Sequence, residues 1–146
     1  MKIRNVFLSA ARAFAFVLFF SFNVKAQSAQ NVFTEKALGN LVMGIQSDNY
    51  GLKRDCIYLA AKYKLSELVN VLVDEFKSEK NPKTRVLIAL ALYNIGDRNG
   101  IESVYHASTN DIDLKVRKTC LEAMRNFESE NPNYDGMGSV SFNENQ

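Results

Sequence analysis

The 146-residue sequence is poor in the residues that build metal and catalytic centres. Its only histidine is His106, and its only cysteines are Cys56 and Cys120. His106 has no cysteine or carboxylate at the spacing that metal ligands require, and no nucleophile at the spacing of a catalytic pair. We therefore expect no metal, no cofactor and no catalytic residue, and we interpret the chain as a protein that is not an enzyme.

The sequence also lacks an apolar run of about 20 residues, the length that a membrane-spanning helix needs. The run at residues 13–22 (AFAFVLFFSF) is shorter, follows a basic start and precedes Val24 and Ala26, which have the spacing that a signal peptidase reads. This pattern predicts a secretory signal peptide over residues 1–26 and an exported protein, periplasmic or extracellular, without stable membrane insertion after cleavage. A retained anchor is the alternative. No cysteine follows the run, which disfavours a lipoprotein.

A block of basic residues is missing from the chain beyond residue 26. Residues 1–26 hold four of the 18 basic side chains and none of the 16 acidic ones, so the remainder has 14 basic and 16 acidic side chains and a net charge of −2. A mildly acidic chain without a basic patch has no electrostatic means of holding a phosphate backbone. We therefore predict that nucleic acid is not a partner.

A periodic pattern is present instead. In residues 84–97 (TRVLIALALYNIGD), apolar side chains stand 3, 4, 6 and 7 positions after Arg85, which places them on one face of a helix. The same offsets from Arg54 and Arg117 also give apolar residues, so the three arginines recur at intervals of 31 and 32. At the end of this stretch, Gly96 is suited to the left-handed conformation that ends a helix. Asp97 is suited to accept hydrogen bonds from the amides that open the next one.

The pattern predicts a stack of two-helix units, because one such unit cannot bury its apolar face alone. The stack would hold half a unit, two full units and half a unit, about six helices in all. The helices without a repeated arginine are expected at residues 34–46, 65–79 and 99–108. The last helix, which carries Arg117, is expected at residues 114–127. Residues 27–33 are interpreted as a linker and residues 128–146 as a flexible tail. In that tail, Val140 and Phe142 could cover the last unit, unless a partner or a second copy does so.

At this level of detail the chain resembles a known family. Residues 84–101 (TRVLIALALYNIGDRNGI) resemble a HEAT repeat, of the short HEAT-like kind also found in phycobilisome lyases. Residues 116–124 (VRKTCLEAM) are similar, and residues 53–61 (KRDCIYLAA) less so. The resemblance covers residues 34–127 and implies an all-α fold without β-sheet, a right-handed α-α superhelix of the HEAT-like solenoid type. The whole chain is similar to small exported bacterial HEAT-repeat proteins of unassigned activity.

The resemblance also implies a structural role for the repeated arginines. In HEAT-like repeats the arginine at this position usually bonds an acid of a neighbouring turn, and here an acid precedes each arginine by six residues. Pairs of this kind contribute about 1 kcal/mol or less each when they are partly exposed. Binding of anionic ligands by the arginines is the alternative. The predicted ladder consists of Asp48, Arg54, Glu79, Arg85, Asp111 and Arg117.

The two cysteines are expected to lie two units apart. With stacked helices about 10 Å apart, their separation would far exceed the roughly 7 Å between Cα atoms that a disulfide allows. Cys120 is interpreted as a core residue. Cys56 stands one position off the predicted apolar face, so partial exposure is expected, and a disulfide between two molecules through Cys56 is the alternative.

Function is expected on the second helix of each unit, which lines the concave side of a HEAT stack, where partners usually bind. The leading hypothesis is an exported, non-enzymatic scaffold that binds another protein there. The alternatives are an accessory subunit or lyase-like enzyme, a structural envelope module that self-associates through its open repeat ends, and a solvated face without a ligand. The outward positions that would form the partner surface are Asn70, Val71, Asp74, Asn99, Glu102 and His106.

Overall fold

The computed structural model describes residues 33–132 and 134. Within that part of the chain the backbone is helical and contains no β-strand, which confirms the predicted all-α class. No helix among these residues is both long and apolar enough to cross a membrane. The described α-helices are α2 (Glu35–Ile45), α3 (Tyr50–Lys62), α4 (Val69–Ser78), α5 (Pro82–Ile95), α6 (Arg98–Asn110) and α7 (Leu114–Glu130), with a 3-10 turn, η2 (Ser66–Leu68), before α4.

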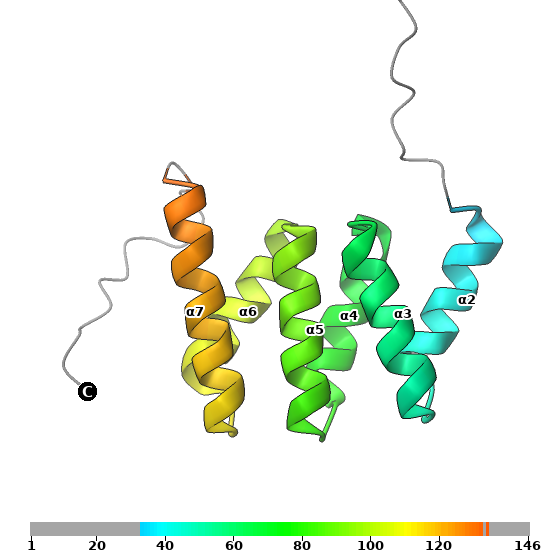
Figure 1. Cartoon of the computed structure of the whole chain (residues 1–146), viewed down its shortest axis with the longest axis horizontal. Coiled ribbons are helices and arrows are strands. Elements are labelled where there is room, and N and C mark those ends of the chain that lie inside the picture. The colour runs from blue at the N-terminus through cyan, green and yellow to red at the C-terminus, as the bar shows by residue number, and fades with distance from the viewer. Residues whose placement is uncertain (1–32, 133, 135–146) are drawn as a thin grey trace, which may run out of the picture. The chain divides into compact units, whose positions relative to one another are not determined.

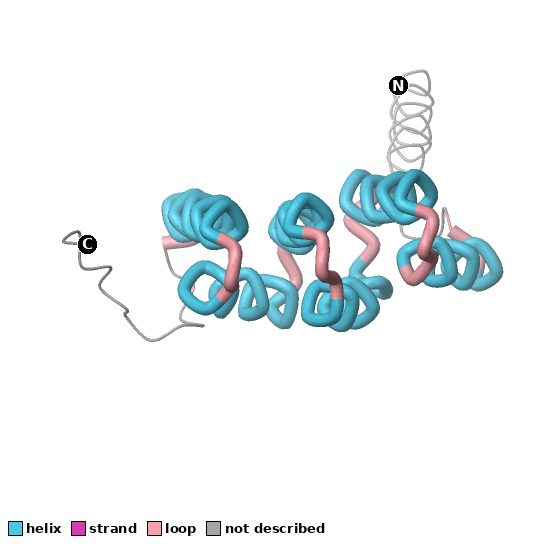
Figure 2. The backbone as a smooth tube through the Cα atoms, turned by 90° about the horizontal axis from the view of Figure 1, so that it is seen from below, coloured by secondary structure: helices cyan, strands magenta, loops and turns pink. Residues whose placement is uncertain are grey.

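The helices lie in two rows (Figures 1 and 2). Helices α3, α5 and α7 stand side by side in one row, and α2, α4 and α6 form the other. Each helix contacts the next helix of its own row, and α2, α4 and α6 each contact the helix that follows them in the chain. The apolar stripe of every helix is therefore covered by neighbours on two sides, as a stack of two-helix units requires.

The three helices of the first row begin in the same way. Their N-cap residues are Asn49, Asn81 and Asp113, and each side chain accepts a hydrogen bond from a backbone amide of the first turn. Such caps satisfy amides that have no partner inside the helix and contribute about 1 kcal/mol each. The interval from the first cap to the second equals the interval from the second to the third. The structural period is thus 32 throughout, and the interval of 31 predicted from Arg54 is wrong by one position.

The turn between α5 and α6 has the predicted chemistry. Gly96 ends α5 with a φ of 76°, in the left-handed region, and its amide donates to the carbonyl of Leu92. Asp97 is the N-cap of α6 and accepts from the amide of Asn99. Both residue roles expected from the sequence Ile-Gly-Asp are confirmed. Lys64 stands one full period before Gly96 and also has a positive φ, of 50°. The hydrogen bonds of the two turns differ, because the amide of Lys64 donates to Ala61 and that of Gly96 to Leu92.

The core lies between the two rows. It contains Ile57 from α3, Ile88 and Leu92 from α5, and Cys120 and Met124 from α7, all without solvent exposure. The second row adds Leu72, Ile101 and Val104, which are equally buried. Complete burial of an aliphatic side chain of this size contributes about 2 kcal/mol, so packing between units is the main source of stability.

Cys56 belongs to this core, contrary to the expected partial exposure. Its side chain is 6% exposed, whereas Tyr58, placed on the apolar face by the arginine-based alignment, is 58% exposed. The alignment based on Arg54 is one position out in α3, because the residue of α3 that is equivalent to Arg85 is Lys53. Gly44 of α2 lies against this cysteine, and a Cβ atom there would stand 2.2 Å from the Cys56 Sγ. A glycine is therefore required where α2 meets α3.

The last helix continues beyond the predicted boundary at residue 127 to Glu130. The ring of Tyr134 packs edge-on against Phe127, with 4.9 Å between the ring centroids. In the last unit, Met124 is fully buried and Leu121 is half-buried. The predicted signal peptide over residues 1–26 and linker over residues 27–33 lie outside the described residues, apart from Phe33, as do Val140 and Phe142.

Candidate functional site

Three cations occupy equivalent positions at the start of the first-row helices. Lys53, Arg85 and Arg117 each stand four residues after an N-cap. Side chains at this position point toward the turn that precedes the helix, because helical side chains lean toward the N-terminus. The geometry of the cap therefore directs all three cations to the loops that connect the two rows.

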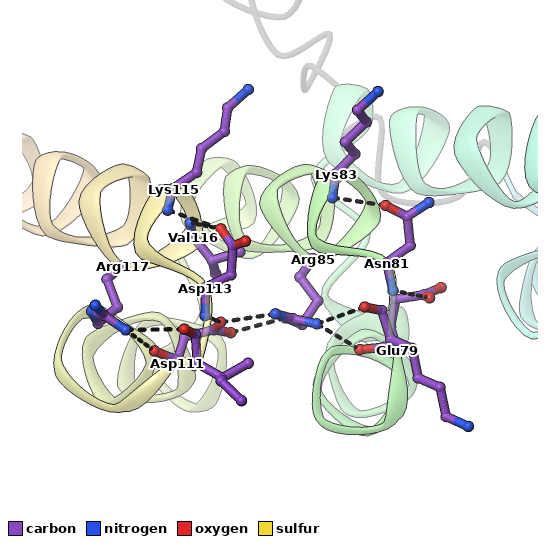
Figure 3. A network of polar contacts seen from close by, with 11 residues as sticks. Glu79, Asn81, Lys83, Arg85, Asp111, Asp113, Lys115, Val116 and Arg117 are labelled. Atoms are coloured by element: carbon purple, nitrogen blue, oxygen red, sulfur yellow. Dashed lines mark hydrogen bonds and ion pairs between the residues drawn. The ribbon is translucent and has the colours of Figure 1, made fainter.

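Arg85 makes the most complete set of contacts (Figure 3). Its Nε and Nη2 donate to the two carboxylate oxygens of Asp111, at 2.9 Å each, and its Nη1 donates to the backbone carbonyls of Glu79 and Lys80 at 3.1 Å. The side chains of Arg85 and Asp111 are only 10% and 9% exposed. Hydrogen bonds to Asp111 also hold the pKa of Arg85 above its ordinary value. This pair joins consecutive units, as the ladder hypothesis predicts. It is better buried than the partly exposed pairs to which about 1 kcal/mol or less was assigned.

Lys53 makes the corresponding contact one unit earlier. Its Nζ donates to Glu79 at 3.0 Å and also to Glu75. Glu79 in turn accepts from the backbone amide of Asn81 at 2.8 Å. Burial tends to raise the pKa of Glu79, but the hydrogen bonds from Asn81 and Lys53 outweigh it, so this pKa lies below its ordinary value. Glu79 is thus a ladder acid as predicted, with a lysine as its partner.

Two members of the predicted ladder do not belong to it. Arg54 forms an exposed ion pair with its neighbour Asp55, because a residue one position after Lys53 points about 100° away around the helix. Asp48 is exposed. The ladder position of the first unit is held by Ser47, whose Oγ accepts from the amide of Asn49 as Asp111 accepts from the amide of Asp113.

Arg117 keeps part of the pattern. Its Nη1 donates to the backbone carbonyls of Asp111 and Ile112, which precede it by six and five residues, as Glu79 and Lys80 precede Arg85. Figure 3 shows Asp111 between Arg117 and Arg85, bonded by its carbonyl to one and by its carboxylate to the other. Arg117 therefore helps to hold the last turn in place, although no carboxylate among the described residues pairs with it.

A groove of about 560 Å³ lies next to this network, along the second row. Helix α4 contributes Phe76 and Lys77 to its lining, and α6 contributes one face. The ladder residues Glu79, Arg85 and Asp111 also line it, together with Ile112, which is 91% exposed. The ladder contacts also hold the turns that join these helices to the first row, and three of their residues form one wall of the groove.

The predicted partner surface is divided by the structure. Asn99, Glu102 and His106 line the groove. Asn70 is next to it, because the Asn99 Nδ2 donates to the Asn70 Oδ1 at 2.9 Å and so connects α6 to α4. Val71 and Asp74 lie on α4 outside the groove lining, Val71 half-buried and Asp74 exposed.

Sequence reasoning missed two kinds of groove residue. Phe76 of α4 is buried in the core and also lines the groove. Ile112 lies in the turn between α6 and α7, to which periodicity assigns no face. The available signal was weak, namely an isoleucine inside the polar sequence Asn-Asp-Ile-Asp, because single exposed apolar side chains are common on protein surfaces.

The chemistry available in the groove is hydrogen bonding and modest electrostatics. Glu102 accepts from the Arg98 Nε at 3.1 Å, and this pair is largely exposed. His106 is exposed, and its backbone carbonyl accepts from Thr109 and Asn110. Within the described residues, no group of three or more His, Cys, Asp or Glu side chains is placed to hold a metal ion.

The two thiols lie elsewhere, in the core. Cys56 and Cys120 are free and buried. Burial raises the pKa of Cys120 to about 12, and it also raises the pKa of Cys56. Because the thiolate is the reactive form, both side chains are apolar packing residues at neutral pH.

Comparison with known proteins adds no relative: no family model matches the chain, and no curated protein and no solved structure matches it.

Proposed function

We propose that this protein is an exported, non-enzymatic helical scaffold that binds a segment of another protein in the groove along α4 and α6. We further propose that its two rows of helices form a right-handed HEAT-like superhelix. The constant period between the repeated caps supports this arrangement, as does the resemblance of residues 84–101 to a HEAT repeat. Export is supported by the pattern of residues 1–26.

The observation that carries the binding proposal is the composition of the groove. It brings three of the predicted partner residues, Asn99, Glu102 and His106, to one site on the second row. Its volume of about 560 Å³ is within the range of concave ligand sites on proteins. Polar groups of this kind give orientation and specificity, while apolar surface such as that of Ile112 gives affinity.

Rigidity of the groove supports the same proposal. Buried ion pairs fix Glu79, Arg85 and Asp111, and the hydrogen bond between Asn70 and Asn99 holds α4 and α6 together. A preformed wall loses little conformational entropy on binding, which favours affinity from a small contact area.

The proposal is tested by affinity capture with a matched pair of variants. His106→Glu adds a negative charge inside the groove, and Asn126→Glu adds the same charge at an exposed position of α7 in the other row. We expect an envelope extract to yield a protein that wild type and Asn126→Glu retain equally. We expect His106→Glu to retain about tenfold less, as for a contact near the centre of an interface. Equal retention by both variants, or no retained protein, would contradict the proposal.

A further inference from the structure

The ladder runs in one direction and ends at Arg117. Lys53 bonds to Glu79 and Arg85 bonds to Asp111, in each case with the acid 26 residues farther along the chain. Each cation thus reaches forward to the next unit. The equivalent position after Arg117 is that of Asn143, which has no carboxylate and lies outside the described residues. Among the described residues, the last cation of the series therefore has no acid as its partner.

The guanidinium of Arg117 is nevertheless held as that of Arg85 is held. In both residues Nη1 donates to the two backbone carbonyls that precede it by six and five positions. These bonds fix the plane of the group and direct its opposite edge away from the turn. In Arg85 that edge, Nε and Nη2, binds both oxygens of Asp111. In Arg117 the same two nitrogens have no hydrogen-bond partner among the described residues.

We infer that the Nε–Nη2 edge of Arg117 is a binding site for a carboxylate of a partner protein. A guanidinium binds a carboxylate through two parallel, charge-assisted hydrogen bonds, which are stronger than bonds between neutral groups and more specific than an ion pair with lysine. Arg117 is half-buried and already oriented by its backbone contacts, so little side-chain entropy remains to be lost on binding.

The surroundings of Arg117 define the kind of acidic residue that fits. Ile112 is 91% exposed and Leu114 is 56% exposed, on either side of the cap residue Asp113. One of the carbonyls that hold Arg117 is that of Ile112. Arginine is one of the residue types enriched in interface hot spots, and the exposed apolar side chains beside it can exclude water from its hydrogen bonds. The site thus favours an aspartate or glutamate flanked by apolar residues in the partner.

A second copy of this chain is a poorer occupant than another protein. If two copies continued the stack end to end, the position that faces Arg117 would be the ladder position of the first unit. That position holds Ser47, whose hydroxyl already accepts from the amide of Asn49. A hydroxyl cannot replace the two charged oxygens that Asp111 offers to Arg85. The inference goes beyond the proposed groove, since Arg117 is not among the residues that line it.

The test is NMR observation of the arginine Nε–Hε groups of the full chain during titration with two peptides. One is N-acetyl-Leu-Asp-Leu-amide, and the other has asparagine in place of aspartate. We expect the aspartate peptide to shift the Arg117 resonance and to bind about tenfold more tightly than the asparagine peptide. Arg125, exposed on the same helix, is the internal control and should not respond. Arg117→Lys should weaken binding, because it keeps the charge and loses the fork.

Four results would overturn the inference. The first two are equal shifts at Arg117 and Arg125, and equal affinity for both peptides. The third is an Arg117 Nε–Hε resonance that shows a hydrogen-bonded group before any peptide is added. The fourth is an Arg117 shift that depends on protein concentration alone. The third would mean that the chain supplies the carboxylate itself, and the fourth that a second copy does. These results concern the Nε–Nη2 edge of Arg117, which does not line the groove, so they are distinct from a failure of the proposed function.

Discussion

The contacts of Asp111 concentrate several roles in one side chain. Its carboxylate binds Arg85 at two points and accepts from the amide of Asp113, and its carbonyl accepts from Arg117. Glu79 has the same double role one unit earlier, with Lys53 and the amide of Asn81. A single carboxylate therefore joins the cation of one unit to the helix cap of the next.

Replacement of Asp111 by alanine should be costly. It leaves the guanidinium of Arg85, which is 10% exposed, without its carboxylate, and loss of one partner of a buried pair costs about 3 kcal/mol. The control is Glu102→Ala, which removes the largely exposed pair with Arg98 and should cost about 0.5 kcal/mol or less. Urea unfolding of the two variants and wild type measures both values. If Asp111→Ala were no more destabilising than Glu102→Ala, the ladder would have no structural role.

Glu79 should give the stability a dependence on acid pH. Its pKa in the folded chain lies below the ordinary value of 4.5, so the folded state binds fewer protons than the unfolded state. Its contribution is then fully present above about pH 5 and is lost as the pH falls through 4.5 toward the folded pKa. Glu79→Gln should be less stable than wild type at pH 7, and the difference should shrink below pH 4.5. A difference that stays constant from pH 7 to pH 3 would show that Glu79 carries no such linkage.

The helix ends show which parts of the fold could be predicted from the sequence and which could not. Gly96 and Asp97 are recognisable because the residue types themselves fit a left-handed C-cap and an N-cap. The register of α3 was missed because a lysine and an arginine are adjacent there, and alignment by residue type selected Arg54. The caps Asn49, Asn81 and Asp113, which are evenly spaced along the chain, contained the correct register.

The turn after α3 offers a test at the level of one helix. Lys64 has a φ of 50° at the position equivalent to Gly96, and a residue with a Cβ atom is strained by about 1 kcal/mol in this region. Lys64→Gly should therefore raise the free energy of unfolding by about 0.5 to 1 kcal/mol, and Gly96→Ala should lower it by about 1 kcal/mol. Thermal unfolding measures both. Destabilisation by Lys64→Gly would mean that the left-handed conformation does not strain Lys64.

Across the whole stack of described helices, periodicity accounts for the scaffold but only partly for the site. The outward positions of α6 followed from its apolar face, and Asn99, Glu102 and His106 do line the groove. Ile112 reaches the groove because of the position of the turn between α6 and α7. The helical period carries no information about the position of a turn residue. Val71 and Asp74 are missing from the groove because only one side of α4 borders it.

The proposed function depends most on the claim that a partner lies against the groove. A photoreactive amino acid placed at His106, compared with the same residue at Asn126 in the other row, tests this claim directly in living cells. The account predicts a light-dependent adduct of one defined mass at His106 and none at Asn126. An adduct at Asn126 alone, or none at either position, would contradict it.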